Sequence, residues 1–215
     1  MRGALLFAPV LAGLLLAGCG AAKREPSITE KDAARAAELA KHQGWDKLFV
    51  GTQQTIAIAN QFGYRNGEYA AAKDGSGFAS TGATPAISSS YAKAPNTTGF
   101  TATGASADRL DRLVFTLDIT DPDNAVTAKK RFRDILDQFL GQFGIDVKAD
   151  TTKLVTDEVE GSRTYPGATL TVAKQEVKGA PPRSRRLVVT FERTGGTAPA
   201  NSEPEAQGTN DGNRR

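Results

Sequence analysis

Two carboxylates of this sequence, Asp118 and Glu158, are the kind of side chain that would have to be tested for a role in catalysis. Asp118 lies near the end of an alternating apolar stretch, and Glu158 belongs to a short acidic run before Gly161. A carboxylate pair can act as general acid and general base when the fold holds the two groups about 5–10 Å apart in a cleft. The alternative is that Glu158 is only a solvated residue at the end of a strand.

Other catalytic or metal-binding groups are scarce. The chain has one histidine, His42, and one cysteine, Cys19, so a nucleophile–histidine arrangement or a zinc site has little to build from. We expect His42 to complement the dipole at the end of a helix. The acidic run that begins at Asp121 does not match an EF-hand loop, because Phe132 stands at its twelfth position. We therefore predict no metal site and no cofactor, and our first hypothesis has no catalytic residue.

A basic run at residues 178–186 contains four positive charges and no negative one. Two consecutive prolines in it favour a solvated hairpin loop. The functional alternative is contact with an anionic lipid or glycan surface through Lys178, Arg183, Arg185 and Arg186. The net charge of the whole chain is only +3, so we predict no nucleic-acid binding.

The first nineteen residues follow the order of an export signal. Arg2 precedes an apolar run at residues 4–16, and small residues lead to Cys19. The ending Leu16-Ala17-Gly18-Cys19 resembles the lipobox of bacterial lipoproteins. The resemblance implies cleavage after Gly18 and acylation of Cys19, which becomes the first residue of the mature protein.

The lipobox resemblance also implies an address. Two or more acyl chains attach a protein stably to a membrane, where one chain binds reversibly. In this family an aspartate after the cysteine favours the inner membrane; Gly20 occupies that position here, which favours the periplasmic face of the outer membrane. Two alternatives are an ordinary secretory leader and a transmembrane helix, the latter because no charge separates Arg2 from Lys23. Pro9 and Gly13 interrupt the apolar run and weigh against a span.

Composition and the positions of glycine and proline divide the chain into six parts. They are a signal peptide at 1–18, a lipidated tether at 19–28, a helical segment at 29–63, an irregular region rich in Gly, Ala, Ser and Thr at 64–107, an α+β core at 108–193 and a disordered tail at 194–215. A capping box at Thr29-Glu30-Lys31-Asp32 predicts a helix that extends to Gln43. A second helix is expected from Asp46, with Trp45 and Val50 as a hydrophobic staple, although residues 55–59 also suit a strand.

The elements that must hold these side chains follow from hydrophobic periodicity. In the irregular region we expect only short strands near 87–91 and 100–103, with a mobile loop as the alternative. An alternating pattern predicts a strand from Arg112 to Ile119, and Asp121-Pro122 begins an amphipathic helix that ends at Gly144. Three further strands are predicted at 153–160, 168–177 and 186–193 as an antiparallel meander. This β-α-β-β-β order predicts an α+β two-layer sandwich, an antiparallel sheet with one long helix packed on it.

Two classes of function remain. The first is a membrane-anchored envelope lipoprotein without catalysis, which binds an envelope protein or an anionic glycan or lipid, or helps to assemble the envelope. The second is an enzyme that acts on envelope glycan or lipid through carboxylates such as Asp118 and Glu158. The two differ in whether these carboxylates share one cleft.

Overall fold

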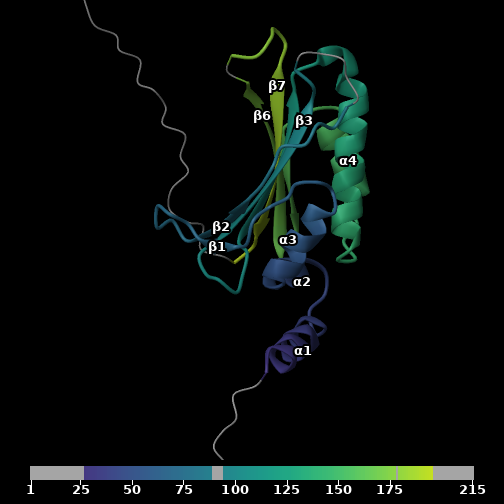
Figure 1. Cartoon of the computed structure of the whole chain (residues 1–215). Coiled ribbons are helices and arrows are strands. Elements are labelled where there is room, and N and C mark those ends of the chain that lie inside the picture. Colours follow the sequence, from purple (N-terminus) through teal and green to yellow (C-terminus); the bar gives the residue numbers. More distant parts are fainter. Residues whose placement is uncertain (1–26, 89–93, 178, 196–215) are drawn as a thin grey trace, which may run out of the picture. The chain divides into compact units, whose positions relative to one another are not determined.

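The computed structural model describes residues 27–88, 94–177 and 179–195 (Figure 1). The predicted signal peptide, Cys19, Lys178 and the tail after Gly195 lie outside the described residues. Contacts between Cα atoms divide the chain into two compact units, residues 1–36 and 37–215.

Helix α1, Ile28–Leu39, accounts for the described part of the first unit and continues a few residues into the second. Its capping box lies two residues earlier than predicted. Ser27 donates its backbone N–H to the Glu30 carboxylate at 2.6 Å, and Glu30 donates its own backbone N–H to the Ser27 hydroxyl at 3.2 Å. The predicted extension to Gln43 is wrong, because the helix ends at Leu39, and no residue of α1 is buried.

The second unit is built on one antiparallel sheet of seven strands in the order β1-β2-β3-β4-β7-β6-β5. Its strands are β1 Ala70–Ala71, β2 Phe78–Thr81, β3 Thr97–Gly104, β4 Arg112–Ile119, β5 Gly161–Tyr165, β6 Ala168–Glu176 and β7 Arg185–Arg193. The predicted strands at β4, β6 and β7 are confirmed within one residue. The fold is α+β with more sheet than predicted, because β1, β2 and β3 extend the sheet beyond β4.

One face of the sheet carries the core. Every second residue of β4 is buried, beginning at Leu113, and the apolar stripe of α4, Ala125–Gly141, packs on this face (Figure 1). The Phe139 ring of α4 lies 5.1 Å from the Phe115 ring of β4. The helix α4 follows a 3-10 turn at Pro122–Asn124, so proline stands at the first helical position as expected.

The opposite face is rich in threonine. Along one row of cross-strand partners, Thr101 faces Val114, Val114 faces Thr190, and Thr190 faces Thr171. These β-branched, partly polar side chains suit a sheet face that contacts water on one side.

The segment before β4 is more regular than its composition predicts. β3 is an eight-residue strand paired along nearly its whole length with β4. Tyr64 is fully buried, and its hydroxyl lies 3.0 Å from the Thr98 hydroxyl. A small residue allows this close pairing: a Cβ atom on Gly99 would stand 2.7 Å from the hydroxyl oxygen of Thr116, its partner in β4. Tertiary partners therefore order a sequence that has too few large apolar residues to fold alone.

The predicted strand at 153–160 is wrong. Residues Lys148–Thr151 form α5, and Thr152–Thr156 form a π-helix. Leu154 and Val155 are both buried although they are neighbours, which a helical turn allows and an alternating strand does not. The strand of this region is β5, Gly161–Tyr165. It begins at Gly161, the residue that is predicted to follow the strand at 153–160.

Residues 44–60 form two helices, α2 Gly44–Val50 and α3 Thr52–Asn60. The alternative of a strand at 55–59 is therefore wrong. Trp45 lies inside α2, and its ring lies 5.6 Å from Phe191 and 5.7 Å from Tyr165. The aromatic ring thus joins α2 to the helix-covered face of the sheet.

Candidate functional site

The two candidate carboxylates are each bound by an arginine of β7. Arg185 donates to Glu158, with 2.5 Å between Nε and Oε2, and Arg186 donates to Asp118, with 2.5 Å between Nε and Oδ1. Adjacent residues of a strand point to opposite faces of the sheet. The register supports this, because Arg186 is the cross-strand partner of Asp118 while Arg185 faces Ile119. The sheet therefore separates the two carboxylates instead of presenting them in one cleft.

Glu158 forms a three-residue ionic cluster that sequence reasoning did not anticipate. Lys129 of α4 contacts it at 2.9 Å and also donates to the Thr156 carbonyl oxygen at 2.7 Å. The Glu158 side chain is 14% exposed and that of Lys129 is 15% exposed. The hydrogen bonds from Arg185 and then from Lys129 lower the pKa of Glu158 from about 4.5 to about 2, against burial that raises it.

These ion pairs determine what the carboxylates can do chemically. A general acid near neutral pH needs a raised pKa, as in a carboxyl group within an apolar pocket. Glu158 has the opposite perturbation and stays ionised, with its oxygens occupied by two cations. Its geometry is that of a structural link between α4, the π-helix and β7.

The described arginines of the basic run do not together form a free cationic patch. Arg185 and Arg186 each form an ion pair, and both residues are partly buried. Arg183 lies in the β6–β7 connection with a backbone φ of +68°, and Lys178 lies outside the described residues. Of the four predicted contact residues, Arg183 is the one described residue whose side chain is exposed.

His42 and Asp121 have local roles. His42 lies beyond the end of α1, where its backbone N–H donates to Leu39 O at 3.2 Å and its ring contacts Asp46. The Asp121 carboxylate accepts from the side-chain amide of Asn124 at 2.6 Å, just before α4. Within residues 27–88, 94–177 and 179–195, no group of three or more His, Cys, Asp or Glu residues is arranged to hold a metal ion.

Among the described residues, a hollow of about 580 Å³ at one end of the sheet is the binding candidate that we consider. We call it the Trp45 hollow. Its lining is Gln43, Gly44, Trp45, Asp46, Phe49, Gly144, Pro166, Gly167, Arg193 and Thr194. The volume falls within the range of about 300–1,000 Å³ that is usual for small-ligand pockets.

The aromatic floor of the Trp45 hollow is held rigidly. Trp45 contacts Tyr165, whose hydroxyl donates to the Asp150 carboxylate at 2.5 Å. Burial and this acceptor both raise the pKa of Tyr165 above its ordinary value. Gly167 permits the close approach of the β5–β6 turn, because a Cβ atom there would stand 3.3 Å from the Trp45 Cβ atom in a backbone conformation with φ of +95°. The indole is thus fixed with 8% of the residue exposed.

The polar rim of the Trp45 hollow contains one negatively charged and one positively charged side chain. Asp46 is exposed, with 65% of its side chain accessible. Arg193 is oriented by the buried Asp111, which accepts from its Nε at 3.2 Å and its Nη2 at 2.8 Å. A guanidinium has five N–H donors, so the donors beyond these two remain for other acceptors. The lining therefore combines one carboxylate, one guanidinium and an apolar surface.

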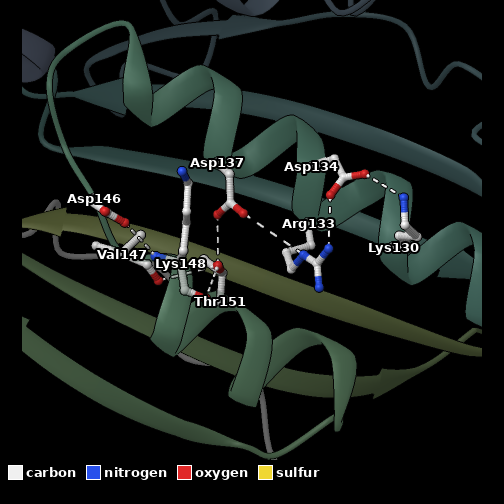
Figure 2. Close-up of polar contacts among 8 residues, drawn as sticks. All are labelled: Lys130, Arg133, Asp134, Asp137, Asp146, Val147, Lys148 and Thr151. Atoms are coloured by element: carbon white, nitrogen blue, oxygen red, sulfur yellow. Dashed lines mark hydrogen bonds and ion pairs between the residues drawn. The ribbon is translucent and has the colours of Figure 1, made fainter.

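Polar contacts along α4 include one that joins this helix to α5. In Figure 2, Asp137 of α4 lies between Arg133 and Thr151, and the Thr151 hydroxyl donates to it at 2.8 Å. Asp134 contacts Arg133 at 3.1 Å and Lys130 at 3.4 Å along the outer side of α4. By joining α4 to α5, the Asp137–Thr151 hydrogen bond constrains the connection that contains Gly144.

A second, smaller hollow lies between α4 and the segment before β3. It measures about 370 Å³, and its lining is Ala86, Ile87, Arg131, Asp134, Ile135 and Gln138. Arg131 spans it by donating to the Ile87 carbonyl oxygen at 3.0 Å. Its lining shares no residue with the Trp45 hollow, so it offers a matched control surface.

Sequence reasoning missed the Trp45 hollow because its parts are distant in the chain. Trp45 and Arg193 lie about 150 residues apart, and only strand pairing brings β7 beside the α2 segment. The available signal is a single tryptophan flanked by Gly44 and Asp46, whose spacing to Val50 predicts only a local hydrophobic staple.

No family model matches this chain, and neither does any curated protein or solved structure. In the part of the chain that the structure describes, no helix has the length and apolar character to cross a membrane.

Proposed function

We propose that this chain is a lipid-anchored bacterial envelope protein whose folded unit binds a ligand or partner without catalysing a reaction. The observation that carries the binding role is the Trp45 hollow, whose lining combines the closely packed Trp45 with the charged residues Asp46 and Arg193. The lipobox-like Leu16-Ala17-Gly18-Cys19 supports the anchor. With Gly20 after the cysteine, the periplasmic face of the outer membrane is the proposed location.

The finer architecture is also a proposal. We describe the helix-covered sheet as a two-layer α+β sandwich, supported by α4 and α2 packing on the same face through Phe139 and Trp45. The carboxylate enzyme is the weaker candidate function, because Asp118 and Glu158 are each paired with an arginine. Nothing in their geometry resembles an acid–base pair across a cleft.

The anchor is tested by replacing Cys19 with alanine in the full-length chain. We expect loss of labelling by a fatty-acid analogue and a shift from the membrane fraction to the soluble fraction, because the acylated side chain is absent. Cys19→Ser serves as a second variant of similar size. Retention of either variant in the membrane fraction would favour the transmembrane alternative.

The binding role is tested by photo-crosslinking in the native membrane. A photoreactive residue placed at Gln43, on the rim of the Trp45 hollow, is expected to form discrete adducts that a residue placed at Gln138, on the second hollow, does not form. Adducts are detected by mass spectrometry of the purified chain. Identical patterns from the two positions, or none from Gln43, would contradict a binding role for the hollow.

A further inference from the structure

We propose that the Trp45 hollow binds a neutral saccharide, of the kind found in envelope glycans, with the sugar hydroxyls held between Asp46 and Arg193. This inference rests on the proposed binding function and specifies its ligand class. It follows from three properties of the lining: its charge balance, its mixture of hydrogen-bonding groups and its apolar floor.

The charge balance argues against a strongly ionic ligand. The lining contains one carboxylate, Asp46, and one guanidinium, Arg193. Behind the guanidinium, Asp111 already satisfies part of its charge. An anion would approach Arg193 against the charges of Asp46 and Asp111, and a cation would approach Asp46 against the charge of Arg193. A neutral ligand avoids both this charge repulsion and the cost of removing an ion from water.

The hydrogen-bonding groups suit a ligand that donates and accepts at several points. The Asp46 carboxylate only accepts, the Arg193 guanidinium only donates, and Gln43 and Thr194 do both. A sugar hydroxyl can donate to a carboxylate and accept from a guanidinium at the same time. Few other neutral ligand classes offer several such groups on one small rigid ring.

The floor supplies the apolar contact that such a ring needs. Trp45, Phe49 and Pro166 belong to the lining, and Gly44, Gly144 and Gly167 add no side chains to it. Aromatic residues with polar neighbours commonly bind ligands that have one apolar and one polar side. The C–H face of a sugar ring meets this description.

Trp45 also supplies the assay, because it is the only tryptophan of the chain. The full-length protein, in a detergent without sugar head groups, is titrated with a trimer of N-acetylglucosamine and with a glucose trimer. We expect a saturable change in tryptophan fluorescence with at least one of them. The preferred trimer distinguishes an N-acetylated envelope sugar from a general preference for glycans.

Two rim variants and one control variant test whether the saccharide binds at the Trp45 hollow. Asp46→Asn and Gln43→Ala are expected to weaken saccharide binding, the former about tenfold, as for the loss of one hydrogen bond to a charged group. Asp134→Asn, a carboxylate on the second hollow, should bind as the parent does. Far-UV circular dichroism checks the fold of each variant, and Gln43→Ala retains the Asp46 contact with His42.

The outcomes separate the ligand class from the binding function. Absence of a saturable signal with both sugars, or affinities unchanged in both rim variants, overturns the saccharide proposal. If a charged peptide such as trilysine or triglutamate changes Trp45 fluorescence while the sugars do not, the ligand class is wrong and the binding role stands. If no probe binds and Gln43 forms no specific adduct, the proposed function fails as well.

Discussion

Replacing Phe115 with alanine is expected to lower the free energy of unfolding by about 4 kcal/mol, the cost of removing a fully buried phenylalanine from a packed core. Phe115 lies on the helix-covered face of β4 and is 0% exposed. Its ring lies 4.7 Å from Phe100, 5.1 Å from Phe139, 6.0 Å from Tyr64 and 6.1 Å from Phe191. The substitution therefore leaves a cavity where two neighbouring strands, α4 and the Tyr64 segment meet.

Urea denaturation followed by circular dichroism measures this loss. Phe115→Leu should cost less than the alanine variant because it retains most of the apolar volume. Val126→Ala is the matched control on α4, since Val126 is 78% exposed, and it should change stability by less than about 0.5 kcal/mol. Equal stabilities for Phe115→Ala and Val126→Ala would contradict the aromatic core described here.

Glu158→Gln is expected to destabilise the folded unit by about 2 kcal/mol near neutral pH, because removal of the carboxylate leaves two partly buried cations without their ionic partner. The amide has nearly the same shape as the carboxylate, so the loss reports charge and not packing. Lys129 and Arg185 would both lose their ionic partner. Asp134→Asn, at a more exposed pair on α4, should cost no more than about 1 kcal/mol.

Glu158→Gln is also expected to change how the free energy of unfolding depends on pH. The pKa of Glu158 is about 2 in the folded chain and about 4.5 ordinarily, so ionised Glu158 favours the folded state. This contribution is complete above about pH 5 and is lost as the pH falls toward about 2. Unfolding measured between these values should show a steep acid-induced loss in the parent and a shallower one in Glu158→Gln. Parallel curves would show that Glu158 is not held by the two cations.

Much of the sheet could be predicted from local patterns. In β4 apolar and polar residues alternate, and burial alternates with them. The stripe of α4 likewise follows the helical period and is buried at Phe132, Leu136 and Phe139. These patterns are informative because one face of each element is buried and the other is not, so the period of the sequence equals the period of the structure.

The failures occur where local preference is ambiguous. Residues 152–156 contain β-branched side chains that suit a strand, yet they form a π-helix because Leu154 and Val155 are both buried beside α4. β3 lacks a strong pattern and is ordered by its pairing with β4. Tertiary packing overrides weak intrinsic preferences in both segments.

The sequence by itself determined the amphipathic helix and the alternating strands, and it predicts a lipobox-like leader, because each of these is encoded within a few neighbouring residues. Only the tertiary structure decided which groups meet. It paired Arg185 with Glu158 and Arg186 with Asp118, and it brought Trp45 to Arg193 at the Trp45 hollow. Such contacts join residues far apart in the chain, and their geometry depends on strand order and register, which no local pattern specifies.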